Sequence, residues 1–277
     1  MKISNNEIII RPKKIFSIRD IQEIWTYRDL LYTFIWRDIK VRYKQTLLGI
    51  AWVILQPIVS MVIFTVLFGN LAKVPSGNLP YSLFVLCGLV FWQFFAGSIS
   101  GASDSMISNE AIIQKVYFPK IILPLVSVVT NFVDFMINFT ILLLYASVIG
   151  YYPNWHALII IPVAIFISVI TASGVGLLLS SMNVKYRDVR YILPFFIQIL
   201  LFLTPVIYPL SIVSDRNKYL MALNPMTSVI ESVRLMFVEG YIMSINLFLV
   251  SFLSALFIFF FGVGFFYKTQ RFFADII

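Results

Sequence analysis

Six stretches of this sequence carry at most one charged residue each, and each is long enough to cross a lipid bilayer as a helix. A hydrocarbon core of about 30 Å needs about 20 helical residues. Only 12% of the residues are charged, against about 25% in an ordinary soluble domain. The sequence therefore predicts an all-α integral membrane protein. Its six transmembrane helices are expected at about 47–69, 79–103, 121–149, 157–182, 189–210 and 245–267.

The positive charges indicate the orientation of these helices. Seventeen of the 21 Lys and Arg residues lie in the N-terminal arm, in the loops after the second and fourth predicted helices, and in the C-terminal tail. Cationic loops stay on the cytoplasmic side, so we expect both termini in the cytoplasm. The net charge of +8 does not indicate a nucleic-acid partner, because the cations border apolar runs. Anionic lipid headgroups explain them better.

Residues 1–46 are expected to form a cytoplasmic arm, followed by a transmembrane domain over 47–277. Between Ser17 and Lys44 the apolar residues recur near helical spacing among charges. This pattern favours a helix that lies in the headgroup plane, and a soluble helix that packs on a partner is the alternative. The arm ends in a cationic cluster just before the first span, with Arg37, Lys40, Arg42 and Lys44.

A short helix is predicted between the fifth and sixth spans, on the external side. In "LNPMTSVIESVRLMFVEG", Asn224 has the position of an N-cap and Gly240 lies near the expected stop. The segment 226–238 is about 20 Å long as a helix, which is too short to cross. We expect a re-entrant or surface-lying helix at a pore mouth, with Glu231 and Arg234 one turn apart.

Asp134 is the one acidic residue in the middle of a predicted span. It belongs to a polar stripe whose members recur at steps of four, three and four residues and share one helix face. An intramembrane acid is a functional-site hypothesis by default, and a polar seam between helices is the alternative. The stripe consists of Ser127, Asn131, Asp134 and Asn138.

Two other features bear on the spans. Small residues recur every four positions in the fourth span, which predicts close helix packing. Aromatic residues lie deep in the second and fifth spans, where they suit the apolar faces of sugar rings or simply face lipid. The small residues are Ser168, Ala172, Gly176 and Ser180, and the aromatic set includes Trp92, Phe95 and Phe195.

The sequence offers no soluble catalytic set. No glycine precedes the Lys-Ser/Thr ending of a phosphate loop, so ATP hydrolysis by that means is excluded. A lone His156 and a lone Cys87 argue against Cys/His chemistry. We therefore expect no catalytic residue, no metal site and no cofactor in this chain.

Four signatures, in this order, resemble the membrane subunit of type-2 ABC exporters of polysaccharides, the family of O-antigen, teichoic acid and capsule exporters. They are "RDIKVRYKQTLLGIAWVILQP" (37–57), "NEAIIQKVYFPKIILP" (109–124), "NVKYRDVRYILPFFIQ" (183–198) and "TPVIYP" (204–209), the last followed by "NPM" at Asn224. The resemblance covers nearly the whole chain.

This resemblance implies a homodimer in the plasma membrane, which would be a bacterial inner membrane. Two separate ATP-binding subunits would sit beneath it and hold the ATP and Mg. The family's coupling helix would fall in the loop after the second span, and the loop after the fourth span would brace it. The residues expected to couple to the ATPase are Asn109, Glu110, Lys115, Tyr117, Phe118, Arg187 and Asp188.

The resemblance also implies a substrate, a polyprenyl-diphosphate-linked glycan. Arg37, Lys40, Arg42 and Lys44 would attract its anionic headgroup, with plain anchoring of the arm as the alternative. The path would run along the dimer seam, with an exit gate near the external helix. The channel lining is expected to include Trp92, Phe95, Ser127, Asn131, Asp134, Asn138, Phe195 and Gln198, and the gate Tyr208, Asn224, Glu231 and Arg234.

Three other functions fit parts of the sequence. The same architecture could export a drug or a lipid. A membrane-embedded glycan-lipid transferase would need carboxylates or metal ligands at a membrane face, whereas the acids here are scattered. A passive channel or scaffold would leave the cytoplasmic signatures without a role.

Overall fold

The computed structural model describes residues 18–44, 49–186, 188–238, 244–270 and 273, and these residues form helices and connecting segments without a strand. Five helices within these ranges are long and apolar enough to cross a membrane. This confirms the prediction of a helical integral membrane protein. The five are Ala51–Leu71, which joins α3 (Ile50–Phe64) to the π-helix η1 (Thr65–Leu71), then α4 (Tyr81–Ser108), α6 (Ile122–Val148), α7 (Ala157–Lys185) and α11 (Ile245–Thr269).

Shorter helices complete the described chain. Two lie in the N-terminal arm, one follows α4, and the others lie between α7 and α11. They are α1 (Ile18–Thr26), α2 (Arg28–Lys44), α5 (Glu110–Ile113), α8 (Val189–Leu203), the 3₁₀ turn η2 (Leu210–Ile212), α9 (Asp215–Ala222) and α10 (Pro225–Leu235). The predicted boundary at residue 46 falls outside the described residues.

The fifth predicted helix, 189–210, is too long by seven residues at its C-terminal end, because α8 ends at Leu203. Pro205 disfavours a helical backbone at the residue before it, and Thr204 is extended with φ −91° and ψ 139°. The chain beyond Thr204 contacts the end of α8, because the hydroxyl of Tyr208 donates to the carbonyl of Phe202 at 3.0 Å. The 15 residues of α8 span about 22 Å, so a sixth straight crossing stays a prediction.

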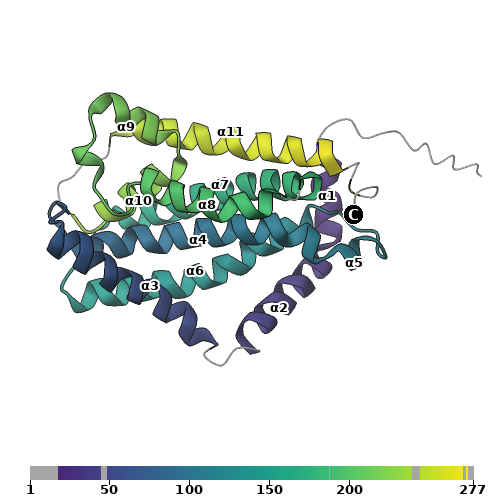
Figure 1. The fold of residues 1–277 in the computed structure, drawn as a ribbon, viewed down its shortest axis with the longest axis horizontal. Coiled ribbons are helices and arrows are strands. Elements are labelled where there is room, and N and C mark those ends of the chain that lie inside the picture. Colours follow the sequence, from purple (N-terminus) through teal and green to yellow (C-terminus); the bar gives the residue numbers. More distant parts are fainter. Residues whose placement is uncertain (1–17, 45–48, 187, 239–243, 271–272, 274–277) are drawn as a thin grey trace, which may run out of the picture.

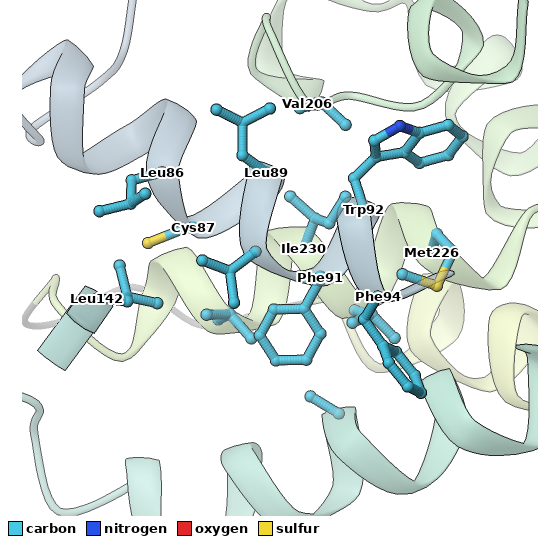
Figure 2. Packing of buried hydrophobic residues seen from close by; sticks show 14 of the residues in the cluster. Leu86, Cys87, Leu89, Phe91, Trp92, Phe94, Leu142, Val206, Met226 and Ile230 are labelled. Atoms are coloured by element: carbon cyan, nitrogen blue, oxygen red, sulfur yellow. The ribbon is translucent and has the colours of Figure 1, made fainter. Parts of the chain in front are cut away.

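Helix α4 is the centre of the bundle. It packs against α6 on one side and α7 on the other, and α11 covers α7 from outside (Figure 1). Figure 2 shows Leu142 of α6 on the side of Leu86 and Cys87 of α4, and Met226 of α10 on the side of Trp92 and Phe94. Phe91 stacks edge-on against Phe135, with ring centroids 4.9 Å apart. Most of α4 is therefore buried within a single protomer.

Helix α7 uses small residues on two faces. Ser168, Ala172 and Ser180 are buried, and a Cβ atom on Gly176 would lie 2.8 Å from the Cβ of Ala102 on α4. The packing role predicted for this stripe is confirmed. On another face, a Cβ on Gly174 would lie 2.6 Å from the Cα of Phe259. The backbones of α7 and α11 therefore touch, as small residues allow in membranes.

The arm packs beneath the bundle. Helix α2 contacts α6, and Phe34 of α2 stacks edge-on against Phe118 at a centroid distance of 5.8 Å. Figure 1 shows α2 and α3 diverging below α6. Cations of α2 lie over exposed indole rings, Arg28 over Trp25 and Lys40 over Trp36. Aromatic and cationic groups of this kind suit a membrane interface, which stays a prediction.

We expect Gly262→Ala to destabilise the bundle, since a Cβ there would enter the backbone of Gly174. Overpacking of this kind costs roughly 1–3 kcal/mol. Gly264→Ala is the matched control on the same helix, because a Cβ there meets nothing within 4 Å. Thermal unfolding in detergent, followed by size-exclusion fluorescence, should show a lower midpoint for Gly262→Ala alone. Equal midpoints would contradict the α7–α11 contact.

Candidate functional site

The Asp134 carboxylate is held by the N-terminal arm. Arg42 donates to one of its oxygens and the hydroxyl of Tyr43 donates to the other. Arg42 also donates to Oδ1 of Asn131 at 3.3 Å. Burial and the hydrogen bond to Asp134 raise the pKa of Tyr43 above its ordinary value, so the phenol stays a proton donor. One predicted headgroup residue and two predicted channel residues therefore form one cluster.

The pairing brings together residues that the sequence placed at different depths. Helix α6 has 27 residues and is about 40 Å long, longer than a hydrocarbon core of about 30 Å. If α6 extends beyond the hydrocarbon core on the side of the arm, Asp134 lies nearer that membrane surface than the middle of the core. A long Arg42 side chain can span the remaining depth.

An open cavity of about 850 Å³ lies beside the cluster, and most of its lining comes from α3, α4 and α6. Four of the predicted channel residues line it: Trp92, Asn131, Asp134 and Asn138. Arg42 also lines it, and 38% of the Arg42 side chain is exposed. The cavity thus joins a cationic group to a polar wall of α6 and an aromatic face of α4.

The other four predicted channel residues do not line this cavity. Phe95 is buried and packs on Trp92 at a centroid distance of 5.6 Å. Ser127 faces α4, near Gly101. Phe195 and Gln198 are exposed on α8, so they face away from the protomer. A path along a dimer seam would need those two residues, and that path stays a prediction.

Helix α10 is buried among α4, α7 and α11, so it packs within the bundle, and its re-entrant or surface-lying place in the membrane stays a prediction. Its predicted cap is confirmed, since Oδ1 of Asn224 accepts from the Met226 N–H at 3.1 Å. Nδ2 of Asn224 donates to Oγ1 of Thr204 at 2.8 Å. The expected stop at Gly240 lies outside the described residues.

The Arg234 side chain forms hydrogen bonds that connect three segments of the chain. It is 3% exposed, and its guanidinium donates to the carbonyls of Phe84 at 3.1 Å and Val206 at 2.7 Å. It also lies over the Phe84 ring, 3.5 Å from the centroid, and reaches Glu231 at 3.4 Å. These bonds join α10, α4 and the segment after α8. The structure therefore places Arg234 in a packing role.

The comparisons with known proteins decide the family. The family model for the ABC-2 type transporter matches residues 29–238. The chain belongs to the ABC-2 type transporter family.

Curated relatives carry more specific names. An O-antigen export system permease protein of Myxococcus xanthus is 32% identical over 80% of this chain and 85% of its own length. A Klebsiella pneumoniae protein of the same name is 28% identical over 90% of this chain and 95% of its own. A polysialic acid transport protein of Escherichia coli is 21% identical over 74% and 80%.

The segment expected to couple this ABC-2 transporter chain to an ATPase follows α4. Asn109 donates to the Ser105 carbonyl at 2.8 Å, while Glu110 and Lys115 are exposed. Tyr117 is 79% exposed, and its hydroxyl donates to Glu23 of α1 at 3.3 Å. Phe118 is buried against Phe34 and so faces inward. The accessible part of the predicted surface therefore excludes Phe118.

The signature at 183–198 lies close by. Arg190 reaches Asp104 at the end of α4 at 3.9 Å, and Nδ2 of Asn183 donates to the Ser103 carbonyl at 3.0 Å. The predicted bracing contact has this geometric support. Asp188 is exposed, and Arg187 lies outside the described residues.

Several residues of the site were missed by the sequence analysis. Tyr43 lay inside a quoted signature without a role. The cavity walls also include Trp52, Gln56 and Ser60 of α3 and Gln93 of α4. Gln56 and Ser60 are four residues apart within an apolar run, and this spacing was the available signal.

We expect a strong coupling energy between Arg42 and Asp134. Arg42→Ala, Asp134→Ala and the double variant form a cycle, and contacting residues in one network couple by roughly 0.5–3 kcal/mol. Thermal midpoints in detergent should fall less in the double variant than the two single losses combined. Additive losses would contradict the ion pair.

Arg234→Lys should destabilise the protein, because lysine cannot donate to both carbonyls while lying flat on Phe84. The loss of one or two charge-assisted hydrogen bonds should lower the free energy of unfolding by roughly 2–4 kcal/mol. Arg216→Lys, on an exposed position of α9, is the matched control. An unchanged thermal midpoint for Arg234→Lys would show that the buried network is not needed.

Proposed function

We propose that this chain is the membrane subunit of an ATP-driven exporter of a lipid-linked polysaccharide similar to O-antigen. The observation that carries the proposal is the match to an O-antigen export permease of Klebsiella pneumoniae over 95% of that protein's length. Family membership supports a transport subunit. The lack of a phosphate loop in the sequence fits ATP hydrolysis on a separate partner.

The anionic headgroup of the substrate binds at the end of α2 in this proposal. Arg42 is partly exposed and lines the cavity beside Asp134. A diphosphate is a stronger partner for a guanidinium than a single carboxylate oxygen, because it offers several charged acceptors. Arg37 is paired with Asp38 at 2.8 Å, and Lys40 and Lys44 lie on the same helix. These cations attract the headgroup to the surface.

The glycan then passes along the seam between two copies of the chain. The outward faces of α3 and α8 expose large apolar and aromatic side chains such as Trp52, Phe195 and Phe202. Aromatic faces let a sugar chain slide by stacking. Weak, repeated contacts suit conduction better than one tight site. Tyr208 in the segment after α8, and Asn224, which donates to Thr204 of that segment, border the exit.

The partner ATPases act on the cytoplasmic loops. Glu110, Lys115 and Tyr117 present an exposed surface after α4. This surface is joined to the arm through Tyr117–Glu23 and Phe118–Phe34. When ATP binding closes the two partners, the push reaches α2 directly and moves Arg42 against Asp134. Both termini lie in the cytoplasm, and the membrane is a bacterial inner membrane.

A drug or lipid exporter of the same architecture is the second candidate. The cavity favours the glycan, because Asn131 and Asn138 of α6 line it with neutral hydrogen-bonding groups. An apolar cargo would leave the Oδ1 of Asn138 without a donor. A glycan-lipid transferase would need catalytic carboxylates, whereas the one carboxylate in the cavity wall, Asp134, is held by Arg42 and Tyr43.

Deletion of the gene in its host tests the proposal. We expect the surface glycan to disappear and its lipid-linked form to accumulate inside the cell. The wild-type chain should restore export, and Arg42→Ala should restore less than about a tenth of it while inserting normally, because a charge-assisted contact of about 1.5–3 kcal/mol is lost. Arg28→Ala, exposed on the same helix, is the control. An unchanged surface glycan in the deletion strain would contradict the function.

A further inference from the structure

The wall of the cavity holds an unpaired hydrogen-bond acceptor. Asn138 is 6% exposed, and its Oδ1 accepts no hydrogen bond from any described residue. A buried amide oxygen without a donor costs about 1–3 kcal/mol. Asn138 lines the cavity, so a small rotation of its side chain would present this acceptor to a donor on a ligand there.

Other neutral polar groups surround the same space. Gln56 and Ser60 come from α3 and Gln93 from α4, and all three line the cavity with Asn138. Each carboxamide offers both donors and an acceptor. Four uncharged groups from three helices at bilayer depth would be costly against lipid tails. The lining therefore fits a ligand that is itself neutral and rich in hydrogen-bonding groups.

Aromatic rings complete the lining. Trp92 is 5% exposed and Trp52 is 57% exposed, and both line the cavity. Indole faces stack on the apolar C–H faces of a ligand while its polar edges stay free. Sugar rings combine such faces with hydroxyl or acetamido edges. A lipid tail has no polar edge and would leave Asn138 unpaired.

The position of these groups relative to Arg42 gives them an order. Arg42 bonds Asp134 and Asn131, and Asn138 lies one turn beyond Asp134, about 6 Å along α6. A phosphate at Arg42 would therefore place the group attached to it next to Asn138. In a lipid-linked glycan that group is the first sugar.

We propose that this cavity is a recognition subsite, built within one protomer, for the sugar that is attached directly to the diphosphate of the lipid carrier. Gln56, Gln93 and Asn138 bind its hydroxyl or acetamido groups, and the exposed indole of Trp52 stacks on its ring. The subsite rests on the proposed export function and adds a selectivity step before the seam. It distinguishes a loaded carrier from an empty one.

The test compares three lipids on the full chain in nanodiscs, with any subunit that co-purifies. They are a short polyprenyl alcohol, its diphosphate, and the diphosphate bearing one N-acetylhexosamine. Affinity is measured by thermophoresis. We expect the glycosylated lipid to bind at least tenfold more tightly than the bare diphosphate, and the alcohol to bind most weakly.

Single substitutions distinguish binding of the sugar from binding of the diphosphate. Asn138→Leu should abolish the gain from the sugar and leave the affinity for the bare diphosphate unchanged. Gln56→Leu should reduce the gain in the same way, and because Gln56 is exposed on α3 the substitution should leave the fold intact. Arg42→Ala should weaken both diphosphates equally. Thr140→Ala is the control, since Thr140 is exposed on α6 and donates to the Met136 carbonyl.

Two results overturn the subsite. One is equal affinity of the wild-type chain for the bare and glycosylated diphosphates. The other is a loss in Asn138→Leu and Gln56→Leu that is the same for both lipids. Either result leaves the headgroup step of the export proposal standing if both diphosphates bind more tightly than the alcohol. If neither does, the headgroup step fails, and the subsite fails with it.

Discussion

The ion pair between Asp134 and Arg42 determines how the arm meets the bundle. A carboxylate among apolar helices must be paired, because its desolvation costs several kcal/mol. The polar neighbours of Asp134 on α6 are neutral amides, so the compensating charge has to come from another element. Helix α2 supplies it, with Tyr43 on the second oxygen. The ion pair thereby holds α2 against α6. Its two charged groups, Arg42 and Asp134, also line the cavity.

The two conspicuous arginines of the sequence have different environments. Arg234 is 3% exposed, and its guanidinium is occupied by two backbone carbonyls, Glu231 and a phenyl ring. Arg42 keeps 38% of its side chain exposed and borders an open cavity. The first arrangement fixes α10 and the segment after α8 in place. The second leaves Arg42 accessible from the cavity, as the proposed headgroup contact requires.

The sequence predicted the features that depend on local pattern. Charge-free runs predicted the long helices within a few residues, Asn224 was recognised as a cap, and the small-residue stripe of α7 packs as expected. The end of α8 was misplaced although Pro205 carried the signal for it. Helical periodicity places a residue on a face without naming the neighbour that covers the face. It therefore missed the pairing of Arg42 with Asp134 and the burial of Phe118.

The proposal that this ABC-2 transporter chain works as the membrane subunit of an ATP-driven complex can be tested by mild-detergent purification of the tagged chain from its own host. Co-purifying proteins are identified by mass spectrometry, and the eluate is assayed for ATP hydrolysis. We expect a stoichiometric partner with a phosphate loop, and hydrolysis that is lost when the exposed segment from Glu110 to Tyr117 is altered. A stable chain without such a partner, under conditions that preserve other membrane complexes, would contradict it.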